Sequence, residues 1–250
     1  MEKQYEEEIA KEFRKCVENT LQRLKADPTL SPFHEALLSK EAILWSRFER
    51  SFSTSFGQRV IERLSQMVAL AYGAEEAVIG QRTNCRLTEY QLRAIEAHIS
   101  DLRSGALKPN WKVDLEKIVN ARGGEKRDEQ VISDLWYKRE GREHFVSIKT
   151  VKPNIDQTAQ AKRDLLKIKV AYPESQVYFG LYYNPYGEKK ADYAWSMPFK
   201  IFDMHNDEVA LVGREYWETI GGKGAYDRIL EIARAVGKET QNKVEAFARQ

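Results

Sequence analysis

Residues 131–157, with the sequence VISDLWYKREGREHFVSIKTVKPNIDQ, constrain the fold of this chain more than any other stretch. Two runs rich in β-branched and aromatic residues, Val131–Tyr137 and His144–Val151, flank a polar connection that contains Gly141. Such runs around a glycine-containing turn are typical of two paired antiparallel strands. We therefore predict a β-hairpin here.

This hairpin can bring an acid and a base together. Because side chains alternate across a strand, Ser147 and Lys149 share one face of their strand, and Asp134 on the partner strand can meet that lysine. Over residues 147–169, six Lys and Arg residues outnumber two Asp residues, which gives a local charge of +4. The pattern predicts a metal-dependent phosphodiesterase that acts on a polyanion. An amphipathic hairpin without any chemistry has the same pattern, so that alternative stays open.

The composition limits the possible partners. The 250 residues carry a formal net charge of only +2, so a nucleic-acid contact has to come from a local patch. Cys16 and Cys85 match no zinc or disulfide spacing, which fits a reducing cytoplasm. The acidic start of the sequence has no apolar leader, and no run of about eighteen apolar residues occurs. We expect neither secretion nor membrane insertion.

Apolar spacing predicts that the first half of the chain is mostly helical and the second half is mixed. Residues 73–87 are expected to form a loop, and residues 120–129 a linker into the hairpin. The predicted helices are Lys3–Lys25, a segment from Ser31 to Phe48, Gln58–Tyr72, Thr88–Arg103, Val113–Val119, Thr158–Val170 and the tail from Arg214. Further strands are predicted at Gln176–Tyr183 and Val209–Val212, and either a strand or a recognition loop at Asp192–Asp203.

These elements predict an α/β fold with a central mixed β-sheet flanked by helices. We expect residues 1–120 to form a mainly helical part packed on the core. Residues 121–250 are expected to hold the catalytic core and C-terminal helices, and the two parts to be one continuous unit.

Several short motifs resemble those of the PD-(D/E)xK nuclease superfamily, and more closely the type II restriction endonucleases of the TdeIII type. The motifs are GGEKRDE at 123–129, Asp134-Leu135-Trp136, Ile148-Lys149-Thr150 with Lys152-Pro153-Asn154 and Gln157, YNPYG at 183–187, Tyr216-Trp217 and Gly221-Gly222. The resemblance implies an Mg²⁺-dependent endonuclease for double-stranded DNA. It also implies a homodimer, a palindromic site similar to GGNCC and a cognate DNA methyltransferase.

Ser147 departs from the superfamily pattern, which has Asp or Glu two positions before the lysine. Some restriction enzymes similarly have serine there and use a glutamate from a helix. We consider Glu62, Glu129 and Asp164 as the compensating acid. Glu62 is preferred because its predicted helix is amphipathic, although a surface role for Glu62 and a capping role for Glu129 stay open.

The resemblance implies that Asp134 and the backbone carbonyl of Ile148 bind the metal, with Lys149 assisting the attacking water. Glu62 is our preferred further ligand. Residues after the catalytic strand and in a later turn are the predicted DNA contacts. They are Lys152, Asn154, Gln157, Lys162, Arg163, Lys167, Asn184, Tyr186 and Lys189. Two alternatives are a repair or recombination nuclease and, supported by Ser147, a catalytically silent DNA-binding module.

Overall fold

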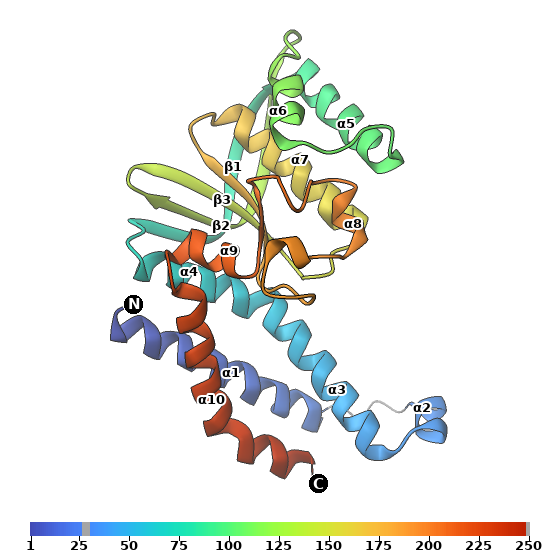
Figure 1. Ribbon diagram of the computed structural model, residues 1–250, viewed down its shortest axis with the longest axis vertical. Helices are drawn as coiled ribbons and strands as arrows, with labels where there is room; N and C mark the ends of the chain where they lie inside the picture. Colours follow the sequence, from blue (N-terminus) through green and yellow to red (C-terminus); the bar gives the residue numbers. More distant parts are fainter. Residues whose placement is uncertain (27–30, 249–250) are drawn as a thin grey trace.

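A computed structural model describes residues 1–26 and 31–248 of the chain, and a five-stranded mixed sheet forms its centre (Figure 1). The strand order is β1-β2-β3-β4-β5. β2 pairs antiparallel with both β1 and β3, and β4 pairs parallel with both β3 and β5. The strands are β1 (Glu76–Thr88), β2 (Lys126–Arg139), β3 (Arg142–Lys149), β4 (Gln176–Leu181) and β5 (Ala210–Val212).

Helices precede, interrupt and follow the sheet along the chain. They are α1 (Lys3–Ala26), α2 (Pro32–Leu37), α3 (Lys40–Ser55), the π-helical turn η1 (Phe56–Val60), α4 (Ile61–Ala71), α5 (Glu89–Ser104), α6 (Trp111–Val119), α7 (Ile155–Ala171), the 3-10 turn η2 (Lys190–Asp192), α8 (Ser196–Phe199), α9 (Arg214–Gly221) and α10 (Ala225–Ala248). The α/β class and the predicted helices are confirmed, except that the segment predicted from Ser31 to Phe48 is divided into α2 and α3. Among the described residues, no helix is long and apolar enough to cross a membrane.

The predicted hairpin is confirmed as β2 and β3. Arg139 pairs with Arg142, so the turn consists of Glu140 and Gly141 alone. Both turn residues have left-handed backbone conformations, with φ values of 51° and 72°. A two-residue turn with two positive φ angles matches the right-handed twist of the strands that it joins.

The sheet is buried on both faces because alternate residues of its strands enter two separate cores. Val146 and Ile148 of β3 pack into a core that also contains apolar residues of α1, α4, α9 and α10. Phe145, on the opposite face of β3, packs with residues of α5, α6 and α7. A strand with this alternation can present a side chain to either layer of helices.

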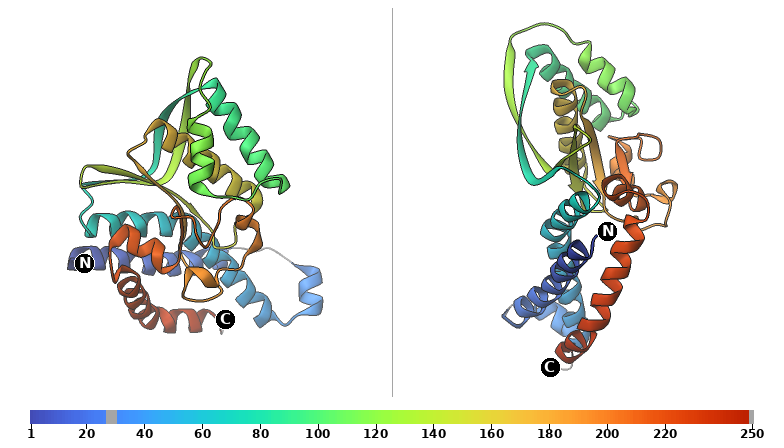
Figure 2. Two further views of the ribbon diagram at one scale, coloured as in Figure 1. Left: turned by 45° about the horizontal axis from the view of Figure 1, so that its top comes forward. Right: turned by 90° about the vertical axis from the view of Figure 1, so that its left-hand side faces the viewer.

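The two ends of the chain lie together. α1 and α10 pack against each other at one end of the molecule (Figure 2), and ion pairs join Arg14 to Glu239 and Lys243 to Glu18. β1, which precedes residue 120, pairs with β2 along most of its length. The first and second halves of the sequence therefore contribute to one sheet and one helical layer.

Two expectations from the sequence are wrong, and one of two alternatives at a third place is excluded. Residues 73–87 hold β1 instead of a loop, because polar side chains on its exposed face hide the alternate burial of Thr83, Cys85 and Leu87. The predicted linker 120–129 contains the start of β2, which extends to pair with the far end of β1. For Asp192–Asp203 the strand alternative is excluded, since its regular elements are the end of η2 and the short helix α8, while the recognition loop stays a prediction.

Lys162 is buried in the core, which corrects its prediction as a phosphate contact. Its side chain is 0% exposed; Nζ contacts the carboxylate of Asp114 and donates a hydrogen bond to the Ile201 carbonyl at 2.7 Å. His98 Nε2 lies 2.9 Å from the other carboxylate oxygen of Asp114. Burial lowers the pKa of Lys162. Lys162 thus ties α7 to α6 instead of reaching solvent.

Replacing Lys162 by Ala is expected to destabilise the chain by about 3 kcal/mol or more, because the Asp114 carboxylate would remain buried without its partner. Lys112→Ala is the matched control, since Lys112 makes an ion pair with Glu208 while 78% of its side chain is exposed. Urea unfolding should show no measurable change for the control. Equal effects of the two substitutions would contradict the structural role of Lys162.

Candidate active site

The candidate site lies where β2 and β3 separate. The ladder between these strands ends at the pair Leu135–Val146, while β2 continues beside β1 and β3 continues beside β4. Asp134 and Ser147 are the next residues beyond that pair. β1 is also irregular here, because Gly80 has a left-handed φ of 66° between the residues paired with Leu135 and Ser133. We call this opening the fork.

The carboxylate of Asp134 occupies the fork. Its Oδ2 accepts hydrogen bonds from the backbone N–H of Ile148 at 2.6 Å and from Lys149 Nζ at 2.8 Å. The hydroxyl of Ser147 donates a longer bond to the same oxygen at 3.4 Å. The predicted meeting of the acid and the lysine is therefore confirmed. Both side chains remain about one quarter exposed, so solvent reaches them.

Lys149 connects two oxygen atoms from different strands. Its Nζ bonds Oδ2 of Asp134 and also donates to the carbonyl oxygen of Ile148 at 3.1 Å. One positively charged group thus lies within hydrogen-bond distance of a carboxylate oxygen and a backbone carbonyl oxygen. The fork has the electrostatic character of a small cation site.

Glu62 approaches the fork from the first turn of α4. Burial raises the pKa of Glu62 above its ordinary value of 4.5, and the negative charge of Asp134 raises it further. The positive charges of Lys149 and Arg59 act in the opposite direction. The Glu62 carboxylate is therefore close enough to both fork residues to feel their charges, which the sequence could only suggest.

The other two candidate acids lie in different surroundings. Glu129, on β2, accepts a hydrogen bond from Lys167 of α7 at 2.8 Å, so it joins this helix to the strand. Asp164, also on α7, accepts from the Gln160 side chain at 2.9 Å. Burial raises the pKa of Asp164, and the charge of Lys149 acts to lower it. Asp164 therefore remains within the electrostatic range of the fork through Lys149.

A buried contact that the sequence did not indicate fixes α4, the helix of Glu62. The hydroxyl groups of Tyr216 and Ser65 lie 2.6 Å apart, and both residues are fully buried. The Tyr216 ring packs over Gly180 of β4, where a Cβ atom would overlap the ring. Tyr216 therefore holds α4 against the sheet. Only the motif Tyr216-Trp217 drew attention to this position in the sequence.

The donor atoms at the fork suit Mg²⁺. This ion prefers oxygen ligands and commonly takes only one or two carboxylates from a protein. Asp134, Glu62 and the Ile148 carbonyl supply such oxygens, and Oδ1 of Asp134 accepts no hydrogen bond from any described residue. Across residues 1–26 and 31–248, no group of three His, Cys, Asp or Glu side chains has a metal-binding arrangement. A site with two carboxylates and a carbonyl is compatible with that result.

Several predicted DNA contacts are engaged within the protein. Asn154 and Gln157 form a reciprocal cap at the start of α7. Arg163 pairs with Glu96 at 2.7 Å, and Lys167 with Glu129. These contacts cap α7 and join it to α5 and β2.

The remaining predicted DNA contacts lie in the loop after β4 and, in the case of Lys152, just after β3. Asn184 accepts a hydrogen bond from the Tyr186 backbone N–H and donates to the carbonyl of Lys189, so its side chain shapes the turn. Lys152 Nζ lies 5.6 Å from the centroid of the Tyr186 ring and 5.7 Å from that of Trp195. Lys152 and Tyr186 therefore form an exposed basic and aromatic surface. Lys152 follows Lys149 by three positions in the sequence.

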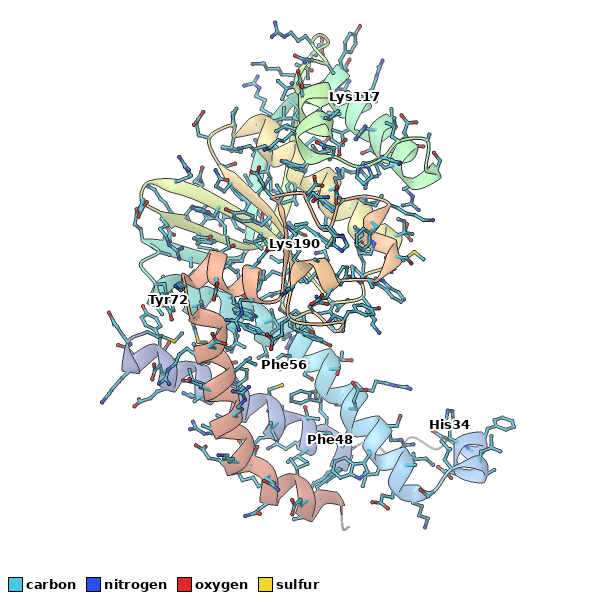
Figure 3. All side chains as sticks on the ribbon, viewed as in Figure 1. His34, Phe48, Phe56, Tyr72, Lys117 and Lys190 are labelled. Atoms are coloured by element: carbon cyan, nitrogen blue, oxygen red, sulfur yellow. The ribbon has the colours of Figure 1, made fainter. Side chains whose placement is uncertain are left out.

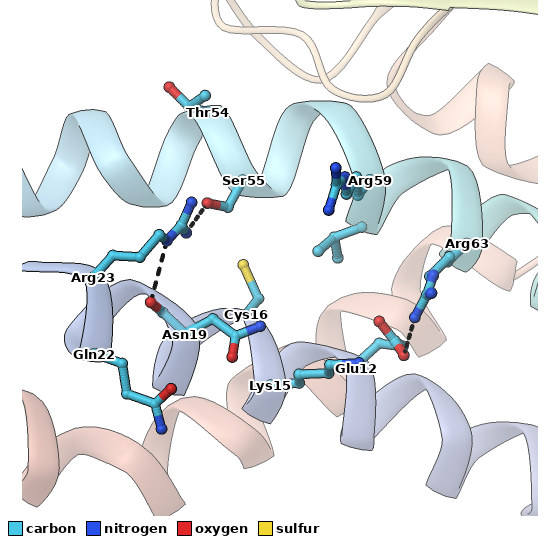
Figure 4. A pocket seen from close by; sticks show the side chains of 11 residues that line it. Glu12, Lys15, Cys16, Asn19, Gln22, Arg23, Thr54, Ser55, Arg59 and Arg63 are labelled. Atoms are coloured by element: carbon cyan, nitrogen blue, oxygen red, sulfur yellow. Dashed lines mark hydrogen bonds and ion pairs between the residues drawn. The ribbon is translucent and has the colours of Figure 1, made fainter.

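A cavity of about 620 Å³ lies between α1 and the helices α3, η1 and α4 (Figure 4). Its basic lining residues Arg23 and Arg63 already contact Ser55 and Glu12. None of the fork residues lines this cavity. Arg59 does line the cavity, and its positive charge acts on Glu62.

The substitution Glu62→Gln is expected to stabilise the metal-free chain at neutral pH. Folding raises the pKa of Glu62, so the folded state loses stability relative to the unfolded state as pH rises from about 4.5 through that raised pKa. A glutamine at position 62 does not titrate, so the variant does not lose this stability as the pH rises. Unfolding with urea in EDTA between pH 4 and 8 should show that the advantage of the variant grows with pH.

Glu116→Gln, on the exposed face of α6, is the control and should show no such trend. A Glu62→Gln chain whose stability parallels that of the wild type at every pH would contradict the raised pKa of Glu62.

Comparison with known proteins gives one consistent family. A family model described as "Type II restriction endonuclease, HinfI" matches residues 1–237. Three similar proteins from Herpetosiphon aurantiacus are the type II restriction enzymes HgiEI, HgiBI and HgiCII. HgiEI is 32% identical and HgiBI 31% over 241 residues, 93% of this chain and 86% of each relative. HgiCII is 29% identical over 236 residues, 91% of this chain and 85% of the relative. No solved structure matches. The chain therefore belongs to the HinfI family of type II restriction endonucleases.

Proposed function

We propose that this protein is an Mg²⁺-dependent type II restriction endonuclease of the PD-(D/E)xK superfamily that hydrolyses double-stranded DNA. The observation that carries the proposal is the convergence of Asp134, the Ile148 carbonyl and Lys149 at the fork, with Glu62 nearby. An acid on one strand and a lysine on the next are the residues that define this superfamily. The resemblance to the TdeIII type belongs to the same proposal.

Each fork residue has a distinct role in this proposal. Asp134, Glu62 and the Ile148 carbonyl hold the cation, which when bound supplies positive charge to the phosphoryl oxygens. Lys149 donates a hydrogen bond that orients the attacking water and offsets negative charge. The Ser147 hydroxyl donates a hydrogen bond to Asp134. Because serine has no carboxylate, Glu62 supplies the second one.

The substrate and partners follow from the family. The three relatives are named as type II restriction enzymes. We propose a homodimer that cuts both strands of a palindrome similar to GGNCC, in a cytoplasm where a cognate methyltransferase protects the host site. Digestion of unmethylated phage DNA, followed by end sequencing, identifies the site.

The variants Asp134→Ala and Lys149→Ala are each expected to reduce Mg²⁺-dependent cleavage by at least ~100-fold, because each loses a group that acts on the reacting phosphate. Glu129→Gln should cleave within about threefold of the wild type, since Glu129 pairs with Lys167 away from the fork. Timed digestion of one plasmid measures all three rates. If Glu129→Gln also lost cleavage as strongly as Asp134→Ala and Lys149→Ala do, the second carboxylate would be assigned to Glu129.

Moving the second carboxylate provides a sharper test. Glu62→Gln should weaken Mg²⁺ binding and cleavage, and adding Ser147→Glu should restore part of both, because residue 147 adjoins the carboxylate of Asp134. Calorimetric titration with Mg²⁺ in the presence of DNA measures binding for the single and double variants. A double variant no better than Glu62→Gln would show that a carboxylate at 147 cannot replace that of Glu62.

Lys152→Ala is expected to weaken DNA binding and to reduce the slope of log K against log salt by about one if its ammonium contacts a phosphate. A change in site preference with an unchanged slope would instead indicate a base contact by Lys152. Lys11→Ala, an exposed lysine of α1, is the control. Fluorescence anisotropy in Ca²⁺ over a range of salt concentrations measures both properties.

Ser147 favours one competing function, a catalytically silent DNA-binding module. That alternative predicts DNA binding that Lys149→Ala leaves unchanged and no cleavage product with any divalent cation. A repair or recombination nuclease would cut structured or damaged DNA without producing discrete fragments from phage DNA. The fragment pattern therefore separates all three functions.

A further inference from the structure

Helices α2 and α3 form an arm that extends away from the body of the molecule (Figure 1). Neither helix contains a buried residue. The arm nevertheless carries large apolar side chains that are strongly exposed: Phe33 by 81%, Leu37 by 83%, Leu38 by 49% and Trp45 by 39%. A cluster of exposed apolar residues on one projecting element is typical of an interaction surface.

The arm is anchored close to the candidate active site. Phe48, Phe52 and Phe56 stack in succession, with ring centroids 6.3 Å and 5.4 Å apart. Figure 3 shows Phe48 on the arm and Phe56 where the arm joins the body. The Phe56 ring lies 6.1 Å from that of Tyr182. Since η1 continues directly into α4, the orientation of the arm is linked to the helix that carries Glu62.

The charge of the arm indicates which partner fits it. Residues 32–50 contain three Lys and Arg residues and three Glu residues, so their formal charge is zero with His neutral. A neutral apolar surface is a poor match for the polyanionic backbone of DNA. A two-fold interface, by contrast, brings each patch against its own copy, so it suits a surface that carries both signs of charge around an apolar centre.

We infer that the arm is the surface through which two copies of this chain associate, arm against arm about a two-fold axis. The inference rests on the proposed function, because cleavage of both strands of a palindrome uses two equivalent catalytic centres. Burial of Phe33 and Leu37 against the second copy holds the two arms together. Their anchorage at η1 then sets the separation of the two α4 helices and of the two forks.

Sedimentation equilibrium of the full chain tests the inference. The wild type is expected to be a dimer at micromolar concentration, and Phe33→Glu with Leu37→Glu should weaken association by at least ~100-fold. Both side chains face solvent within one copy, so thermal unfolding of the diluted monomer should be unchanged. Val113→Glu is the control, since Val113 is 61% exposed on α6, and it should remain a dimer.

Cross-linking adds a direct measure of contact. Leu37→Cys treated with a short bis-maleimide should give a covalent dimer, whereas Val113→Cys should not. The native Cys16 and Cys85 are buried, so they contribute little background. Leu37→Cys should give the same yield of covalent dimer when Asp134→Ala is added to the same chain.

The outcomes separate this inference from the proposed nuclease function. A monomeric wild type, or a dimer that survives the arm substitutions, overturns the arm interface even if DNA is cut. If the wild type is a monomer and the arm variant loses DNA binding, the arm is a DNA-binding surface instead. A dimer dissociated only by the arm variant supports the inference even if no cleavage occurs, and that lack of cleavage would count against the nuclease alone.

Discussion

The hydrogen bond from the Ile148 backbone N–H to the Asp134 carboxylate is the interaction on which the site depends. At the fork the sheet loses its ladder between β2 and β3, and this 2.6 Å bond satisfies a backbone donor that the neighbouring strand no longer pairs. It also turns the carboxylate toward Lys149. The same bond thus closes the end of the ladder and places the acid beside the base.

The helices on the two faces of the sheet contribute differently to the fork. α4 brings Glu62 from one side, held by the buried contact between Tyr216 and Ser65. α7 lies on the other side, where its basic residues mostly pair with acids of the protein. These pairs join α7 to α6, α5 and β2. Lys152, which precedes α7, is exposed and lies three positions after Lys149 in the sequence.

Local sequence predicted the features that depend on local chemistry. The hairpin turn, the alternation that joins Asp134 to Lys149 and the amphipathic helix of Glu62 all follow from nearby residues. β1 was missed because its pairing with β2 is long-range and Gly80 breaks its pattern. Burial of Lys162 depends on Asp114, which lies 48 residues away. Such distant partners have no signal in composition or periodicity, and the same holds for the contact of Tyr216 with Ser65.

The most direct test of the fork as a metal site is the anomalous signal of Mn²⁺ in crystals of the protein bound to its DNA. Mn²⁺ replaces Mg²⁺ at oxygen-rich sites and can be located without reference to the protein atoms. We predict a peak within about 2.5 Å of oxygen atoms of Asp134, Glu62 and the Ile148 carbonyl. A peak coordinated by Glu129 or Asp164 in place of Glu62, or ordered DNA at the fork with no peak there, would contradict this account.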